Sequence, residues 1–217
     1  MRTKLKKTNK FSKEKINLYI LGFGQLGKLI YMELKKNPKY NIKGFIDINT
    51  KQNKYAGLKV YKNEKLFINK KNLNLALAVG EPTKRLNIIK KFRKSNFLTL
   101  ILDKTYIENS RNIGNGTIVM PFAKILNNTK IGKFCLVGTD VNILHDVSIG
   151  NNCVIGGGSI IGANTYIEKN VLVGVGSIFS SSKKVIGQNS IICSGTVVHK
   201  NIRKNSKVIG NPFKYTL

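Results

Sequence analysis

The stretch ILHDVSIGNNCVIGGGSIIGANTYI, residues 143–167, decides the fold of this chain. An aliphatic residue returns every six positions within it, and glycine follows several of these residues. The same spacing continues on both sides of the stretch, at Ile113, Val119, Ile125, Ile131, Val137, Ile143, Ile149, Ile155, Ile161, Ile167, Val173 and Phe179 and, after one extra residue, at Ile186, Ile192 and Val198. A period of six held over this length is typical of a parallel β-helix built from hexapeptide repeats.

The period also predicts how the coils are built. Three six-residue units make a triangular coil, with the aliphatic residue and the small or β-branched residue four positions later filling the interior. Coils stack at the spacing of neighbouring strands, about 4.8 Å, so residues 18 apart, such as Ile131 and Ile149, should be stacked neighbours. Hexapeptide helices are left-handed, an exception to the usual crossover rule. Residues 113–203 predict about five coils.

Residues 16–103 alternate between short apolar runs and helical spacing. The sequence predicts strands over 16–22, 41–47, 73–80 and 97–103, and helices over 26–36 and from Pro82 onward. This order predicts a small Rossmann-like domain with a parallel sheet. We therefore expect a basic tail over 1–15, an α/β domain over 16–103 and a left-handed β-helix over 104–217.

The chain of 217 residues carries 38 Lys and Arg against 10 Asp and Glu, a formal charge of +28. Because these cations are dispersed and no nucleic-acid-binding motif accompanies them, we expect no specific nucleic-acid partner. The charge favours phosphorylated ligands and at most peripheral membrane association. The basic tail has no apolar core of a secretion signal, and no run of about 18 apolar residues occurs, so we expect a cytoplasmic protein.

The three cysteines, Cys135, Cys153 and Cys193, lack the spacing of a metal site or a disulfide framework. Cys135 and Cys153 are 18 residues apart at the small interior position, so we expect them to stack in the core. We expect no bound metal.

The segment GFGQLG, residues 22–27, lies between a predicted strand and a predicted helix, as a dinucleotide-binding fingerprint requires. Asp47 lies 20 residues beyond Gly27 at a strand end, where its carboxylate could accept hydrogen bonds from a ribose or a base. An NAD dehydrogenase would share this pattern, but a domain of about 90 residues followed by a β-helix disfavours it.

His145 lies two positions after Ile143, in the turn of its repeat unit, so its side chain should point outward. Asp146 follows it. A neutral imidazole can accept a proton from a nucleophile, and a neighbouring carboxylate can orient it. This pair is the predicted catalytic site, with His145 as the general base. His199, the other histidine, is predicted to be structural or solvent-exposed.

The pairing of these two domains resembles the PglD/NeuD family of sugar O/N-acyltransferases. The resemblance is carried by residues 19–27, 45–47, 78–85, 143–167, 171–177 and 208–214. It implies an acetyl-CoA-dependent acetyltransferase that modifies an amine or hydroxyl of a nucleotide-activated or sialic-acid-like sugar in surface glycan biosynthesis. Because the open-sided prism presents three flat faces and His145 lies on a corner that needs a neighbour to form a cleft, we also expect a homotrimer, with acetyl-CoA bound between neighbouring β-helices.

The same resemblance implies two sets of binding residues. Contacts to the nucleotide-sugar fall on Gly24, Gln25, Leu26, Asp47 and Gly80. Contacts to acetyl-CoA fall on Val154, Val175 and Ser194, and the 18-residue spacing to His145 adds Ala163 to them. Ala163 is 18 residues after His145, and its backbone N–H could bind the oxyanion of the thioester intermediate. The chain departs from the family pattern at Leu26 and Val154, where relatives commonly carry histidine.

Two other functions remain open from the sequence. One is O-acetyl transfer to a free metabolite of the serine or maltose type, which the α/β domain disfavours. The other is a nucleotide-binding trimer without catalysis, which the departures at Leu26 and Val154 suggest.

Overall fold

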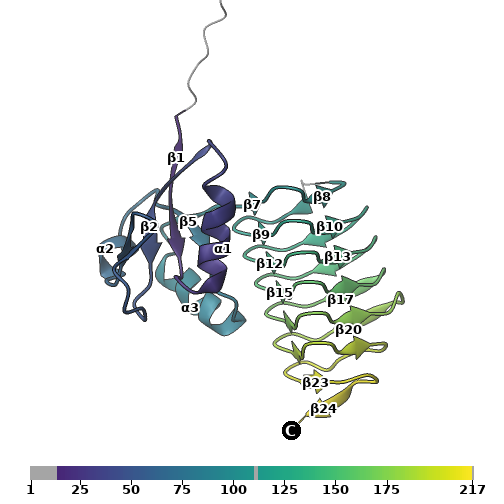
Figure 1. Cartoon of the computed structure of the whole chain (residues 1–217). Coiled ribbons are helices and arrows are strands. Elements are labelled where there is room, and N and C mark those ends of the chain that lie inside the picture. The colour runs from purple at the N-terminus through teal and green to yellow at the C-terminus, as the bar shows by residue number, and fades with distance from the viewer. Residues whose placement is uncertain (1–13, 110–111, 217) are drawn as a thin grey trace, which may run out of the picture.

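The computed structural model describes residues 14–109 and 112–216. Most of the predicted basic tail, residues 1–13, lies outside the described residues. The described elements form two parts that lie side by side, an N-terminal domain of a sheet with helices and a C-terminal stack of coils (Figure 1). The chain therefore has the predicted fold class, a parallel-sheet domain followed by a left-handed β-helix.

The N-terminal sheet has the order β3-β4-β2-β1-β5-β6 among the described residues. Its central strands β1, β2 and β5 are parallel, as predicted. The antiparallel hairpin of β3 and β4 and the short helix α2 are not among the predicted elements. The strands and helices of this domain are β1 (Ile16–Leu21), α1 (Gln25–Leu34), β2 (Tyr40–Ile46), β3 (Lys54–Tyr55), β4 (Leu58–Tyr61), α2 (Lys65–Ile68), β5 (Asn74–Leu77), α3 (Pro82–Lys91) and β6 (Asn96–Phe97).

The two faces of this sheet have separate apolar cores. Helix α1 buries Ile30 and Leu34 together with Leu18, Ile20 and Phe45 of the sheet. Helices α2 and α3 cover the other face, where Phe67 and Phe92 pack with Leu75. Pro82 begins α3, because proline's fixed φ suits the first turn of a helix and its missing N–H is not needed there.

The C-terminal part is a prism of three parallel sheets. The domain-facing sheet is β7 (Leu100–Ile101), β9 (Ile118–Val119), β12 (Leu136–Val137), β15 (Val154–Ile155), β18 (Leu172–Val173), β21 (Ile191–Ile192) and β23 (Lys207–Ile209), with β24 (Lys214–Thr216) antiparallel at its end. The six-stranded prism sheet is β8 (Tyr106–Ile107), β10 (Lys124–Ile125), β13 (Asn142–Ile143), β16 (Ile160–Ile161), β19 (Ile178–Phe179) and β22 (Val197–Val198). The four-stranded prism sheet is β11 (Lys130–Ile131), β14 (Ser148–Ile149), β17 (Thr165–Ile167) and β20 (Lys184–Ile186).

The interior of the prism follows the predicted repeat. Ile131 pairs with Ile149, and Ile149 with Ile167, so residues 18 apart are stacked neighbours. The aliphatic positions from Val119 to Val198 are all buried, and Ile113 is partly buried against the same core. Cys135 and Cys153 are buried there as free thiols.

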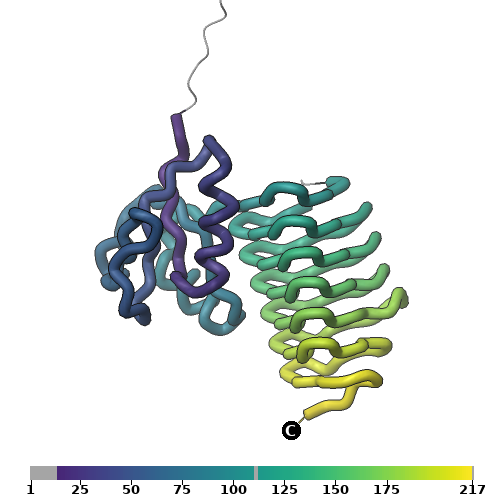
Figure 2. The backbone as a smooth tube through the Cα atoms, in the orientation of Figure 1, coloured from purple at the N-terminus to yellow at the C-terminus, as the bar shows by residue number. Residues whose placement is uncertain are grey.

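Two sequence predictions about the prism are wrong. The apolar run 97–103 is not one strand of the α/β sheet: β6 ends at Phe97, and β7 pairs with β9 in the domain-facing sheet. The predicted five coils are also too few, since the described part of the domain-facing sheet already stacks seven parallel strands, from β7 to β23. Figure 2 shows the coils stacked one upon another towards the yellow C-terminal end. The extra coils lie at the two ends of the array, before Ile113 and after residue 203.

The N-terminal domain is packed against the domain-facing sheet. Ile118, Leu136 and Val154 of that sheet share one buried cluster with Ile30 and Leu34 of α1. On the α3 side, Asn152 Nδ2 donates a hydrogen bond to the carbonyl of Pro82 at 2.9 Å. The contact is thus both apolar and hydrogen-bonded. It covers part of the domain-facing sheet and leaves the other two prism sheets uncovered by this domain.

Candidate active site

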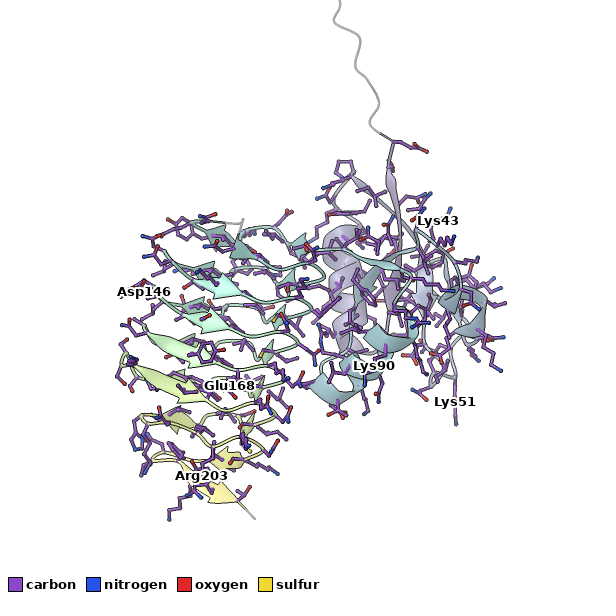
Figure 3. The ribbon with its side chains drawn as sticks, turned by 180° about the vertical axis from the view of Figure 1, so that it is seen from behind. Lys43, Lys51, Lys90, Asp146, Glu168 and Arg203 are labelled. Atoms are coloured by element: carbon purple, nitrogen blue, oxygen red, sulfur yellow. The ribbon has the colours of Figure 1, made fainter. Side chains whose placement is uncertain are left out.

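His145 and Asp146 form a hydrogen-bonded pair at one corner of the prism. His145 follows β13, and its side chain is 56% exposed, as predicted for an outward turn residue. Its Nδ1 atom lies 2.7 Å from Oδ2 of Asp146. Figure 3 shows Asp146 at the edge of the prism that faces away from the N-terminal domain.

The partner of Nδ1 fixes the protonation pattern of the neutral imidazole. An ionised carboxylate only accepts hydrogen bonds, so Nδ1 must carry the proton and Nε2 is left with its lone pair. Hydrogen bonds from His145 and then from Asn128 lower the pKa of Asp146 from its ordinary value of 3.8. The pair can therefore present a neutral, oriented imidazole with Nε2 as a base.

Asp146 also has a backbone role. Its φ is 58°, in the left-handed region that Asp and Asn tolerate better than most residues. Asn128 and Asn164, one coil to either side, adopt the same conformation, with φ of 55° and 60°. The residue after His145 is thus restricted by the turn itself, and among turn-compatible residues the chain places a carboxylate there.

The His145 corner, defined here as the column Asn127, His145, Ala163 and Ser181, joins the six-stranded to the four-stranded prism sheet. Asn164 donates its N–H to the carbonyl of His145 at 3.4 Å, so Ala163 lies one coil from His145, as predicted. The N–H of Ala163 donates to Oγ of Ser181 at 3.3 Å. This N–H is therefore directed to the corner where an acyl oxygen could accept it.

Of the predicted acetyl-CoA residues, Ala163 lies at this corner and the other three do not. Val175 and Ser194 lie on the Val175 corner, defined as the column Thr139, Gly157, Val175 and Ser194, where the domain-facing sheet meets the six-stranded prism sheet. Gly195 donates its N–H to the carbonyl of Val175, so the two residues are one coil apart. Val175 is 62% exposed. The whole width of the six-stranded prism sheet separates this corner from His145.

Val154 does not fit the predicted contact with acetyl-CoA. It lies on β15 in the domain-facing sheet, is only 6% exposed and packs in the cluster that joins the two domains. The sequence correctly predicts the position of Val154 in the repeat. It does not predict which face of the prism the N-terminal domain covers, because that depends on contacts between residues far apart in the chain. Val154 is therefore an interface residue in this structure.

The glycine turn after β1 is closely packed at two of its glycines and open at the third. Gly22 has a φ of 107°, and a Cβ added to it would lie 2.5 Å from the carbonyl oxygen of Ala78. Gly27 is in such close contact with the carbonyl of Gly22 that a side chain would collide with it. Gly24 precedes α1 and has open space around its Cα, so its position leaves the helix N-terminus accessible to a ligand.

Asp47 connects this turn to the end of β2. Its Oδ2 accepts the N–H of Phe23 and its Oδ1 accepts the N–H of Asn49, both at 2.8 Å. Each carboxylate oxygen has a second lone pair, so Asp47 can hold the loop and still accept a hydrogen bond from a ligand. The structural task of Asp47 is thus clear, and a ligand contact would be additional to it.

A pocket of about 270 Å³ lies at the carboxyl ends of β1, β2 and β5. After β1 the chain adds strands on one side of the sheet, and after β5 it adds them on the other side, so the strand order reverses between β1 and β5. Open parallel sheets bind ligands at such a reversal. Gly22 and Asp47 line the pocket, whereas Gly24, Gln25, Leu26 and Gly80 are partly or fully exposed outside it. The structure therefore separates the predicted sugar-nucleotide residues into a pocket and a nearby rim.

Several residues of this region are absent from the sequence-based prediction. Lys84, Asn87 and Lys91 line the pocket from α3, and Lys91 forms an ion pair with Glu64 at 2.6 Å. In the sequence these residues are three or four positions apart, so they share one face of a helix. Lysine is so abundant in this chain that the spacing does not distinguish them.

Arg85 is the second omission. It is fully buried, and its guanidinium donates to the carbonyls of Leu77 and Val79 beside the pocket and of Phe134 in the prism. Burial lowers the pKa of Arg85 to about 10. One cation thus connects the end of β5 to the β-helix.

The remaining predictions concern metals, membranes and His199. Among residues 14–109 and 112–216, no group of three His, Cys, Asp or Glu side chains could hold a metal ion. None of the helices in these ranges has the length and apolar character needed to span a bilayer.

His199 is exposed and lies beside Phe213, with ring centroids 5.2 Å apart.

Solved structures with the same architecture include three bacterial proteins. The acetyltransferase domain of PglB from Neisseria gonorrhoeae, in complex with acetyl coenzyme A, has a TM-score of 0.85 at 22% identity, covering 94% of this chain and 100% of that one. PerB from Caulobacter crescentus, in complex with CoA and GDP-perosamine, has a TM-score of 0.82 at 21% identity, covering 93% and 97%. WeeI from Acinetobacter baumannii has a TM-score of 0.77 at 24% identity, covering 92% and 99%.

Family models assign both parts of the chain. A comparison with curated proteins gives no match. Residues 17–92 match the PglD N-terminal domain, and residues 128–163 match the bacterial transferase hexapeptide of six repeats. The two matches lie one after the other in the chain and confirm its resemblance to the PglD/NeuD family.

Proposed function

We propose that this protein transfers an acetyl group from acetyl-CoA to an amine or hydroxyl of a nucleotide-activated sugar, as a step of surface glycan biosynthesis. The single observation that carries the proposal is the exposed His145–Asp146 pair, which presents Nε2 as a base on a hexapeptide-repeat prism. The solved structures of PglB with acetyl coenzyme A and of PerB with CoA and GDP-perosamine support the choice of substrates.

The pocket at the ends of β1, β2 and β5 is the proposed nucleotide site. Lys84 and Lys91 line it and are ion-paired with Glu81 and Glu64, so they would exchange these partners for the phosphate oxygens of a nucleotide. Asp47 offers a carboxylate oxygen to a ribose or a base. The sugar would extend past Gly24, Gln25, Leu26 and Gly80, which are partly or fully exposed beside the pocket. In this proposal the pocket binds a nucleotide-sugar and not NAD.

The proposed reaction uses His145 as the base. As the acceptor nitrogen or oxygen bonds to the thioester carbonyl carbon, its proton moves to Nε2 and the carbonyl electron pair moves onto oxygen. The N–H of Ala163 donates to that oxygen. When the intermediate collapses, the C–S bond breaks, the thiolate of CoA leaves, and the proton on Nε2 is available to it.

A homotrimer would complete this site. In one chain Asp146 of the His145 corner lies on the side of the prism away from the N-terminal domain (Figure 3), whereas the Val175 corner borders the domain-facing sheet. A groove of about 520 Å³, lined by Leu29, Glu33, Lys104, Met120, Phe122 and Thr139, runs between α1 and the Val175 corner. We propose that the His145 corner of a second copy enters this region and that acetyl-CoA lies between the two corners.

The exposed apolar side chains support this contact. The six-stranded prism sheet presents Tyr106, Ile160 and Ile178 to solvent, and Phe122 and Val175 are exposed at its edge. Apolar side chains clustered on one open face are typical of a surface covered by another subunit. In this arrangement Val175 and Ser194 contact the CoA of a neighbouring His145.

A thiol-release assay with acetyl-CoA across UDP-, GDP- and CMP-sugars that carry a free amine or hydroxyl tests the proposal. We expect release with one nucleotide class. Release with serine or maltose but with no nucleotide-sugar would instead favour acetyl transfer to a free metabolite. Nucleotide-sugar binding without release would favour a trimer that has no catalytic activity.

A further inference from the structure

The His145 corner contains one irregularity in the repeat. Phe179 and the next interior residue, Ile186, are seven positions apart instead of six, and the additional residue falls in the corner segment 180–185. This segment belongs to the coil after Ala163, because Thr165 pairs with Lys184 in the ladder. The insertion therefore sits one coil above the N–H proposed to bind the acyl oxygen.

Lys184 fixes the inserted segment from inside. It occupies the interior position that Thr165 fills one coil earlier, and it is buried. Its ammonium donates to the carbonyls of Ser180 and, at 3.0 Å, of Ser182. Burial lowers the pKa of Lys184. The two residues that flank Ser181 are thus both held by one side chain, which defines where the Ser181 hydroxyl can reach.

Ser181 accepts the N–H that the proposed reaction assigns to the thioester oxygen. Its Oγ accepts the N–H of Ala163 at 3.3 Å, a long hydrogen bond. The residue is exposed, so its side chain can change rotamer on the time scale of picoseconds to nanoseconds. An incoming oxygen acceptor can therefore displace Oγ without moving the backbone.

We propose that Ser181 is a further catalytic residue, whose hydroxyl supplies a second hydrogen-bond donor to the acyl oxygen. In the free protein Oγ accepts the Ala163 N–H. Once the thioester oxygen takes that place, the hydroxyl rotates and donates its own hydrogen to the same oxygen. Two donors then stabilise the negative charge that forms when the acceptor bonds to the carbonyl carbon. This inference rests on the proposed acetyl transfer.

The catalytic test compares three variants of the full-length protein. Ser181→Ala should lower kcat by roughly 10–10²-fold, below the usual cost of a lost oxyanion donor because water can enter this exposed corner. Ser181→Thr keeps a hydroxyl and should keep most of the rate. Ser182→Ala is the matched control, since it removes a hydroxyl of the same segment and leaves the carbonyl held by Lys184. Equal rates for Ser181→Ala and Ser182→Ala would overturn the proposal.

A binding test does not depend on turnover. Calorimetry with acetyl-CoA and with CoA compares two ligands that differ only in the acyl group. Ser181→Ala should weaken acetyl-CoA binding about 2–10-fold, the effect of one neutral hydrogen bond, and should leave CoA binding unchanged. An unchanged ratio of the two dissociation constants would contradict a contact between Ser181 and the acyl oxygen.

The two tests separate the proposals. If the wild type binds acetyl-CoA but acetylates no nucleotide-sugar, the proposed function fails while the ratio of binding constants still decides the role of Ser181. If the wild type binds no acetyl-CoA, both proposals are overturned.

Discussion

Nδ1 of His145 lies 2.7 Å from Oδ2 of Asp146, its neighbour in the chain, and this pairing leaves Nε2 as the free base of the His145 corner. Asp146 makes this contact while it adopts the left-handed conformation of the turn, with a φ of 58°. The turn therefore supplies both the outward position of the imidazole and the carboxylate that orients it.

Replacing His145 should remove most of the activity. His145→Ala is expected to lower kcat by roughly 10²–10⁴-fold, the usual contribution of a general base. Asp146→Asn should lower kcat by a smaller factor. The amide can still contact the ring, although it no longer orients the neutral imidazole as the carboxylate does. Steady-state kinetics on the preferred nucleotide-sugar measures both effects.

His199→Ala is the matched control for that experiment. His199 is exposed beside Phe213 on the last coils and takes no part in the His145 corner. The kcat and KM of His199→Ala should equal those of the wild type. A His145→Ala variant that retains most of its rate would mean that the acceptor attacks without a protein base.

The carboxyl group of Asp146 should titrate below its ordinary pKa of 3.8, chiefly because it accepts a hydrogen bond from His145. A group whose pKa is lower in the folded state stabilises that state above its unfolded pKa, and the stabilisation disappears as pH falls through the folded pKa. Carbonyl-detected NMR titration measures the value. His145→Ala should move it back towards 3.8, and no movement would contradict the pairing.

Arg85 should be important for stability. Arg85→Met removes three hydrogen bonds from a charged donor, each worth about 1.5–3 kcal/mol, and leaves their carbonyl acceptors buried. This loss outweighs the gain from removing one buried charge, so we expect the free energy of unfolding to fall by roughly 3 kcal/mol. Chemical denaturation measures it.

Arg93→Met provides the comparison for Arg85, since Arg93 follows the same helix and is exposed. It should change the free energy of unfolding by less than about 0.5 kcal/mol, as most surface substitutions do. Equal effects of the two substitutions would show that Arg85 does not connect the domains.

Two inactive variants should restore activity together if the site is shared between chains. His145→Ala removes the base from one corner, and Val175→Arg blocks the proposed CoA contact at the other without touching the interior. Random trimers of an equal mixture would have one intact site from two chains in about a quarter of their interfaces. Co-expression followed by thiol release measures the recovery, and no recovery from a trimeric mixture would place the whole site within one chain.

The sequence predicts the β-helix well because its core is one-dimensional: each interior residue contacts its equivalents 18 positions away, so the period appears directly. The number of coils is harder to predict at the ends. Ile101 and Ile107 continue the spacing of six, but Ile101 lies within the apolar run 97–103, which also has the pattern of a buried strand. Val208 lies ten positions after Val198, outside any period.

Within the β-helix, the candidate site is predictable where it depends on the repeat. The outward position of His145 and the stacking of Ala163 follow from counting residues. Whether Val154 faces a ligand or the N-terminal domain depends on how the two domains pack, and no local pattern records that. The contact of Arg85 with the carbonyl of Phe134 spans 49 residues and lies within a run of ordinary basic residues.

The most direct test is to follow CoA release and the nucleotide-sugar together, by thiol detection and mass spectrometry in one reaction. We predict one acetylated nucleotide-sugar for each CoA released by the wild type, with both products lost in parallel in His145→Ala. CoA release without acetylated nucleotide-sugar, or equal product from His145→Ala, would contradict acetyl transfer with His145 as the base.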